Sequence, residues 1–144
     1  MSPRYLAGSV DPRTYPEISV ALSGTHDTEA MAEWWGEAPL ALRQSLLSVC
    51  GLVPDEAGAT QPYVPVVRDA VLRALLGSAS RHVMIPLPDV FGWDVRINTP
   101  ATVTDDNWTW RVPVMIDAWR ESPEWVERAA ALASWSSNSG RVRL

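Results

Sequence analysis

The sequence predicts an α/β chain in which short parallel strands alternate with helices. Two apolar segments, 18–22 and 82–85, have the composition of buried strands, and each is followed by a helix or a polar motif. This order is typical of parallel βα units. Two strands can neither close a barrel nor form a doubly wound sheet, so either architecture would be incomplete in this sequence.

The first strand, 18–22, is β-branched at its start and is stopped by Ser23-Gly24. Asp27 or Thr28 can then provide the N-cap of a helix. The apolar side chains predicted to share one face of that helix are Ala30, Met31, Trp34 and Trp35.

Two more helices are predicted between the strands. One starts near Pro39, a first-turn proline, and stops at Gly51, with an apolar stripe of Leu42, Leu46 and Val49. Residues 52–64 contain proline and glycine and are predicted to form a loop. The other helix spans 65–76, with inward side chains Val67, Val71 and Leu75.

The second strand, 82–85, is cut off by Pro86. A stretch with little periodicity, 88–113, comes after it. The last helix opens at Ser122-Pro123, an N-cap followed by a first-turn proline, and should bury Trp125, Ala129, Leu132 and Ala133.

Composition excludes several classes of protein. The 144 residues suffice for one domain, and 47% hydrophobic residues exclude a mainly disordered chain. Seventeen acidic against twelve basic residues give a net charge of −5, which argues against a nucleic-acid partner. Every base is arginine, which excludes Schiff-base chemistry on a lysine of this sequence, and the single Cys50 excludes an internal disulfide.

No segment approaches the ~20 apolar residues of a membrane span and no signal-peptide core is visible, so we expect no membrane partner and a cytoplasmic location.

The strongest candidate site immediately follows the first strand, at its carboxyl end. His26 and Asp27 place a ring that can donate and accept hydrogen bonds beside a carboxylate. Such a pair can bind neighbouring hydroxyls of a sugar and hold negative charge near a developing cation. The alternative is structural: Asp27 as a helix cap and His26 as an ordinary loop residue.

Two further segments carry candidate residues. Asp89, Arg96 and Asn98 follow the second strand and offer a carboxylate, a guanidinium and an amide, which fit either a hydroxyl-binding lining or a salt bridge within the loop. In the segment 106–111, strand-like alternation would place Trp108 and Trp110 on one side, as a stacking platform or as packed core.

These three segments, in this order, resemble the carboxy-terminal part of the 4-α-glucanotransferases, the amylomaltase or disproportionating-enzyme family. The segment 15–28 looks like the family's seventh barrel strand with its Gly-Thr-His-Asp motif. The segment 85–100, with Ile85-Pro86-Leu87 and Arg96-Ile97-Asn98-Thr99-Pro100, looks like the eighth strand and the loop beyond it. Asn107-Trp108-Thr109-Trp110-Arg111 resembles the family's closing Asn-Trp-x-Trp-Arg.

The resemblance implies the last two βα units and the C-terminal helix of a (β/α)₈ TIM barrel, incomplete in this chain. Residues 1–14 would be an irregular lead-in, and 15–144 the C-terminal portion of the catalytic barrel. The substrate implied is an α-1,4-glucan, transferred to the 4-hydroxyl of an acceptor glucan by a retaining double displacement, with no metal or organic cofactor. Asp27 would stabilise the transition state, and the residues expected to bind substrate are His26, Asn98, Asp89 and Arg96.

The sequence departs from the family pattern at two positions. Pro88 stands where the family usually has glutamine, and Ala101 stands where it usually has glycine. The family's nucleophile and acid/base lie on earlier strands, so we expect this chain alone to be inactive. Its partner would then be the missing N-terminal barrel portion. The alternative is a non-catalytic fragment that binds glucan or completes a split barrel.

Overall fold

The computed structural model describes residues 11–141, so most of the predicted lead-in, residues 1–10, lies outside the described part of the chain. The rest of that lead-in is not wholly irregular, because it contains a 3₁₀ turn capped by Asp11. The elements are η1 (Pro12–Thr14), β1 (Val20–Leu22), α1 (Met31–Glu37), α2 (Leu40–Val49), α3 (Glu56–Thr60), α4 (Pro65–Leu76), β2 (His82–Met84), α5 (Leu87–Phe91), η2 (Ile116–Ala118) and α6 (Pro123–Asn138).

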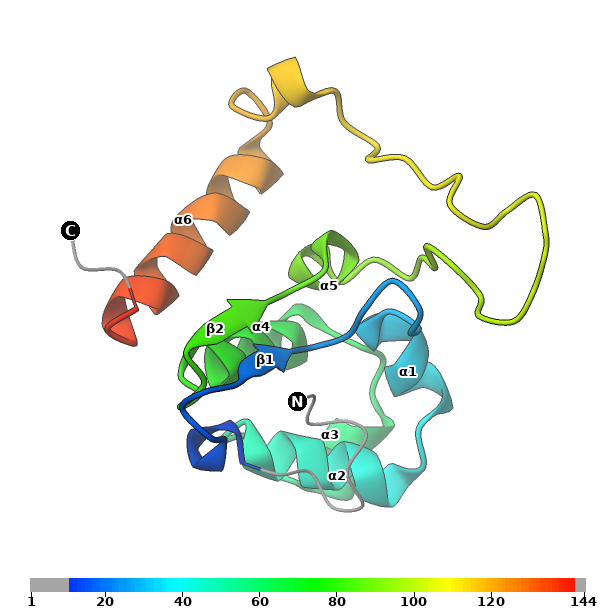
Figure 1. The fold of residues 1–144 in the computed structure, drawn as a ribbon. Helices are drawn as coiled ribbons and strands as arrows, with labels where there is room; N and C mark the ends of the chain where they lie inside the picture. The colour runs from blue at the N-terminus through cyan, green and yellow to red at the C-terminus, as the bar shows by residue number, and fades with distance from the viewer. Residues whose placement is uncertain (1–10, 142–144) are drawn as a thin grey trace.

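The two strands form a parallel sheet, as the sequence predicts, with α1 to α4 lying between them along the chain (Figure 1). Val20 pairs with His82, Ala21 with Val83 and Leu22 with Met84. Both strands are shorter than predicted, since neither Ile18 nor Ile85 belongs to the ladder.

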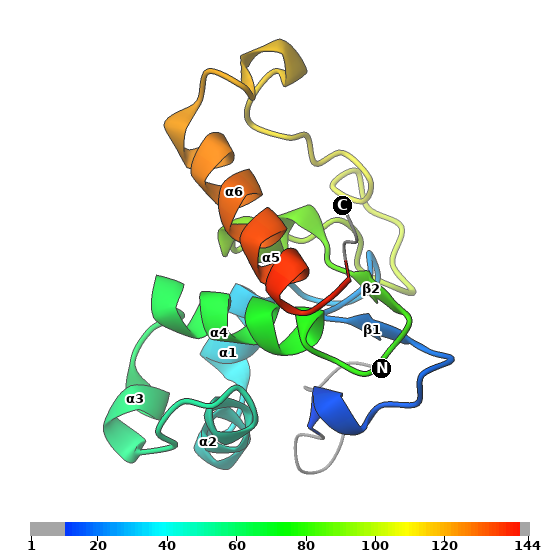
Figure 2. The same cartoon turned by 90° about the vertical axis from the view of Figure 1, so that its left-hand side faces the viewer.

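Helices cover one face of this sheet. Ala21 is fully buried and Val83 half-buried against the core, whose other members come mainly from α1, α2 and α4. Figure 2 shows these three helices on the same side of the strands. Alternate residues of a strand point to opposite faces, so Leu22 and Met84 point away from the helices, and Met84 is 65% exposed.

Local signals predict α4 and α2 well. α4 begins at Pro65 and ends at Leu76, and it buries Val67, Val71 and Leu75 together with neighbouring side chains. α2 begins one residue after Pro39, and Leu46 is buried as predicted, although Leu47 rather than Val49 is the second buried side chain.

The predicted cap of α1 is wrong. Its N-cap is Ala30, which provides no side-chain hydrogen bond, and the hydroxyl of Thr28 bonds to Thr25 instead. The first helical N–H, that of Met31, donates to the carboxylate of Asp89, 58 residues further along the chain. A tertiary contact therefore replaces the local cap.

Two five-residue helices form where the sequence predicts no helix. α3 is capped by Asp55, whose carboxylate accepts from the N–H of Gly58. α5 has proline in its first turn and ends at Phe91, with its C-cap Gly92 left-handed at a φ of 75°. Both are too short to show an apolar period.

α6 begins at Pro123 as predicted and buries Trp125, but its inward face differs from the prediction. Ala129 and Ala133 are exposed, whereas Arg128 is only 7% exposed. Arg128 donates to Asp69 of α4 at 2.8 Å. A charged contact, rather than alanine packing, thus joins the two helices.

The tryptophans mostly serve the core. Trp34, Trp35 and Trp125 are buried, and a second cluster stacks Phe91 on Trp93 at 4.4 Å between ring centroids. All eight tryptophans lie in the described range, and seven of them are buried or half-buried. Among the helices that the structure describes, none has the length and hydropathy needed to cross a bilayer.

Candidate functional site

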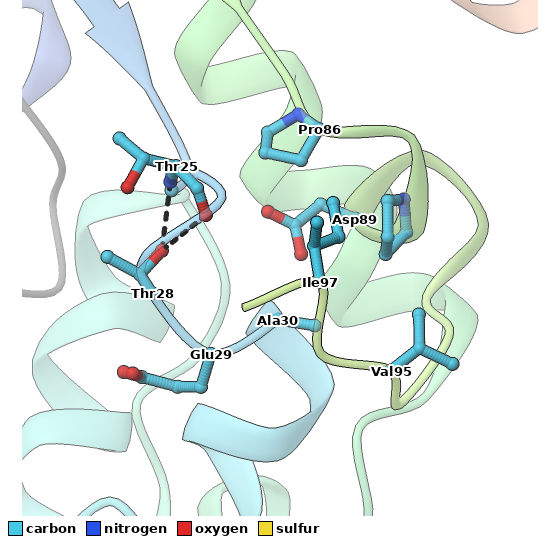
Figure 3. Close-up of a pocket in the computed structure, with 10 residues that line it drawn as sticks. Thr25, Thr28, Glu29, Ala30, Pro86, Asp89, Val95 and Ile97 are labelled. Carbon is cyan, nitrogen blue, oxygen red and sulfur yellow. Dashed lines mark hydrogen bonds between the residues drawn. The ribbon is translucent and has the colours of Figure 1, made fainter. Parts of the chain in front are cut away.

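A tight turn after β1 presents the strongest candidate residues. Ser23 and Gly24 are buried, and the three residues that follow are exposed. Thr25 and Thr28 bond to each other: the Thr25 N–H donates to the Thr28 hydroxyl at 2.9 Å, and that hydroxyl donates to the Thr25 carbonyl at 3.0 Å (Figure 3). This turn holds His26 and Asp27 at the carboxyl end of the strand.

The structure brings three of the five predicted site residues together. The Oδ2 atom of Asp27 lies 3.2 Å from Nε2 of His26, and its Oδ1 atom accepts a hydrogen bond at 2.7 Å from Nδ2 of Asn98. Each carboxylate oxygen can accept more than one hydrogen bond, so Asp27 keeps capacity for the hydroxyls of a ligand. Half of its side chain remains exposed.

Arg96 links the backbone of Asn98 to the start of α1. Its guanidinium pairs with Glu33 at 2.9 Å and lies 3.8 Å from Glu29, and its Nε donates to the carbonyl oxygen of Asn98 at 3.3 Å. The structure therefore places Arg96 beside two carboxylates of the α1 region, and Arg96 also lines an open hollow together with Asn98. Neither glutamate belongs to the predicted site: Glu33 lies in the first turn of α1, and Glu29 comes just before its N-cap.

Asp89 is placed inside the fold instead of on an exposed loop. It is 2% exposed, and its carboxylate accepts hydrogen bonds from the Ser23 hydroxyl at 2.5 Å and the Met31 N–H at 2.7 Å. Figure 3 shows it beside a crevice that Thr25 and Ile97 also line. That crevice measures about 10 Å³, which is room for about one water molecule and not for a sugar.

Asn107 organises the loop that follows Asn98. Its side chain accepts from the Thr99 N–H at 2.9 Å and donates to the Thr102 carbonyl at 3.1 Å. Within this loop Ala101 has a φ of 60°. That is the left-handed region, where glycine is favoured, which gives a physical reason for the glycine at this place in the family pattern.

Trp108 completes the group, although the predicted alternation is wrong. No strand forms over 106–111, and Trp108 has a left-handed φ of 66° that a strand would not contain. The Trp108 ring lies 5.0 Å from that of His26 with a tilt of 42°, whereas Trp110 contacts Trp93. The Trp108 N–H donates to the Ile97 carbonyl at 2.9 Å.

Two open hollows adjoin these residues. One, of about 360 Å³, is lined by His26 and by the uncovered sheet residues Leu22 and Met84. The other, of about 280 Å³, is lined by Asn98 and Asn107. These volumes are near the lower end for ligand clefts, roughly 300 Å³. Within residues 11–141, no three side chains of metal-ligating type gather closely enough to hold a metal ion.

Comparison with known proteins decides the family. A family model described as 4-alpha-glucanotransferase matches residues 4–117. The chain belongs to the 4-alpha-glucanotransferase family. It is 31% identical over 115 residues to the chloroplastic/amyloplastic 4-alpha-glucanotransferase of Oryza sativa subsp. japonica. The aligned residues make up 78% of this chain and 18% of that protein.

Other members of the 4-alpha-glucanotransferase family agree. The chloroplastic/amyloplastic enzyme of Solanum tuberosum is 28% identical over 104 residues, covering 71% of this chain and 16% of the relative. The structure of an amylomaltase from Streptococcus agalactiae in complex with acarbose superposes with a TM-score of 0.68 and 24% identity, covering 92% of this chain and 24% of that one. The chain thus has the fold of part of an amylomaltase, and it spans about a fifth of the length of these relatives.

Proposed function

We propose that this chain supplies the last two βα units and the C-terminal helix of the (β/α)₈ barrel of a 4-α-glucanotransferase. The observation that carries the proposal is the meeting of His26, Asp27 and Asn98 at the carboxyl end of β1. Active sites of such barrels lie at the carboxyl ends of their strands. The family membership supports the same assignment.

In this proposal Asp27 stabilises the transition state. Positive charge develops on the anomeric carbon and ring oxygen of the donor sugar as its glycosidic bond breaks. A carboxylate held in a fixed position opposes that charge without having to reorganise. Asn98 donates a hydrogen bond to one oxygen of Asp27, and Nε2 of His26 lies 3.2 Å from the other. Both side chains also offer hydrogen-bonding groups for hydroxyls of the same sugar.

The remaining chemistry needs two other carboxylates. One attacks the anomeric carbon and forms a covalent glycosyl ester, while the other, as an acid, protonates the departing glucan oxygen. The 4-hydroxyl of an acceptor glucan then attacks the same carbon and gives its proton to the second carboxylate. This attack breaks the ester bond and frees the nucleophilic carboxylate. Retaining enzymes hold these two carboxyl groups about 5 Å apart.

We assign both groups to earlier strands of the barrel, beyond the two strands that the structure describes within residues 11–141. The uncovered sheet face supports this assignment, because Leu22 and Met84 line an apolar hollow that runs to His26. Parallel sheets are normally covered on both faces. In a closed barrel, this face would meet the inward side chains of the other strands.

A mixing experiment tests the proposal. This chain is combined with a polypeptide that carries the earlier barrel strands of a family member, and maltotriose is supplied as substrate. We expect glucose and longer maltooligosaccharides only from the mixture. Saturable maltooligosaccharide binding by this chain with no transfer in any mixture would favour the non-catalytic alternative. The matched control is a mixture in which this chain carries the substitution Asp27→Asn.

A further inference from the structure

Trp108 stands out because its backbone is strained and its side chain is exposed. It has a φ of 66°, a region that bulky side chains rarely occupy, and the residue is 58% exposed. Strain of this kind persists only where surrounding contacts maintain it, and it concentrates at functional sites. Burial of the Trp108 side chain does not offset this strain, because the residue is exposed.

The contacts that maintain the strained conformation are specific. The Trp108 N–H is held by the Ile97 carbonyl, one residue before Asn98 in the chain. The preceding residue, Asn107, anchors the loop through three hydrogen bonds to Thr99 and Thr102. The backbone that places Asn98 against Asp27 therefore also sets the position of the indole.

The indole lies where it can bind the flat face of a sugar. Its ring is 5.0 Å from that of His26 and tilted by 42°, so the two rings are not stacked face to face. Aromatic faces carry partial negative charge, which attracts the weakly positive C–H groups of a pyranose ring. The hydroxyls of such a ring need polar partners. Asp27 and Asn98 each follow directly, along the chain, a residue that Trp108 contacts, since the indole lies against His26 and the Trp108 N–H bonds to Ile97.

We propose that Trp108 is a sugar-stacking residue that sets the position of the glucan unit whose hydroxyls Asp27 and Asn98 bind. This inference rests on the proposed function, because it takes an α-1,4-glucan as the ligand. It assigns to Trp108 alone the stacking role that the strand-like alternation at 106–111 offered to both Trp108 and Trp110. Trp110, which packs against Trp93, does not share this role.

The test separates ring loss from a change in loop stability. Maltoheptaose affinity and thermal unfolding are measured for the 144-residue chain and for three variants. Trp108→Gly removes the ring but suits a positive φ, so we expect affinity to fall about tenfold while the Tm holds or rises. Trp108→Phe keeps an aromatic face and should stay within about threefold of the wild-type affinity.

The matched control is Ala101→Gly, which relieves a positive φ of 60° in the same loop without touching the indole. It should raise the Tm and leave the affinity unchanged. Wild-type affinity in Trp108→Gly would overturn the inference and leave the proposed function standing. Equal losses of affinity in Trp108→Gly and Ala101→Gly would also overturn it, since the loop shape would then be responsible.

A folded wild-type chain that does not bind maltoheptaose at millimolar concentrations would likewise overturn the inference, because the stacking site would not be assembled on this chain. The proposed function would still stand in that case, and the mixing experiment would test it separately. Transfer activity in the mixture without binding by the free chain would then separate the two ideas.

Discussion

The carboxylate of Asp27 accepts a hydrogen bond at 2.7 Å from the side-chain amide of Asn98, a residue 71 positions later in the chain. This contact joins the loop after β1 to the loop beyond β2. It also orients Asp27, since His26 lies against the other carboxylate oxygen. The proposed transition-state stabiliser is therefore held in place by residues from both strand ends.

Replacing Asp27 by asparagine should reduce glucan transfer by about 10²- to 10³-fold in the reconstituted enzyme, because the charge opposing the oxocarbenium-like centre is lost. Asp27 is half-exposed, so the Tm should change little. Glucose release from maltotriose and a thermal melt measure the two effects. Asp117→Asn, at an exposed aspartate of η2, is the control. A loss of less than about threefold for Asp27→Asn would contradict its assigned role.

Asp89 should matter for stability. Asp89→Ala leaves the Ser23 hydroxyl and the Met31 N–H without this acceptor in a buried place. The free energy of unfolding should fall by about 2–3 kcal/mol, as measured by urea denaturation. Asp105→Ala, at an exposed position, should change it by less than about 0.5 kcal/mol. Equal stability of both variants would show that the buried carboxylate does not support α1.

The contact between α4 and α6 should depend on pH through Asp69. Burial raises the pKa of this carboxyl, but hydrogen bonds from Arg128 and Arg68 outweigh burial, so the pKa lies below the ordinary 3.8. The unfolded chain then binds the proton more readily, and the stabilisation is fully present above the unfolded-state pKa. It is lost as the pH falls through the lower folded-state pKa.

We therefore expect the wild-type chain to lose more stability than Asp69→Asn between about pH 5 and pH 3. The measurement is the urea midpoint at several pH values for both proteins. The variant should be the less stable of the two at pH 7, and the difference should shrink in acid. A difference that stays constant over this range would show that Asp69 does not carry the effect.

Arg96 and Glu33 should act as a pair. Their 2.9 Å ion pair is partly exposed, so a double-mutant cycle of Arg96→Gln and Glu33→Gln should give a coupling energy of about 0.2–1 kcal/mol. Urea unfolding of the four proteins measures it. Strictly additive effects would mean that Arg96 does not anchor its loop to α1.

The uncovered sheet face should be needed for assembly with the rest of the barrel. Met84→Lys places a charge on that face at a side chain that is already 65% exposed, so the isolated chain should keep its Tm. Activity in the mixing experiment should fall at least tenfold, because a charge would be buried without a partner. Val103→Lys, at a fully exposed loop residue, should leave activity unchanged. Full activity of the Met84 variant would place the partner elsewhere.

The sequence by itself determined the elements whose signals are local. α4 begins at Pro65 and α6 at Pro123 because proline fits the first turn of a helix, and the parallel strands begin and end within two residues of their predicted limits. The family motifs also pointed to His26, Asp27 and Asn98, which the structure brings together.

Only the tertiary structure decided which way the polar side chains face. Asp89 turns inward because Ser23 and Met31 offer it donors 66 and 58 residues away, and Arg96 pairs with Glu33 across 63 residues. The sequence does not show whether an aspartate is buried or exposed, because this depends on hydrogen-bond partners that are distant along the chain. The conformation of Trp108 follows the same rule, since the bonds that maintain its positive φ come from a loop that only the folded chain assembles.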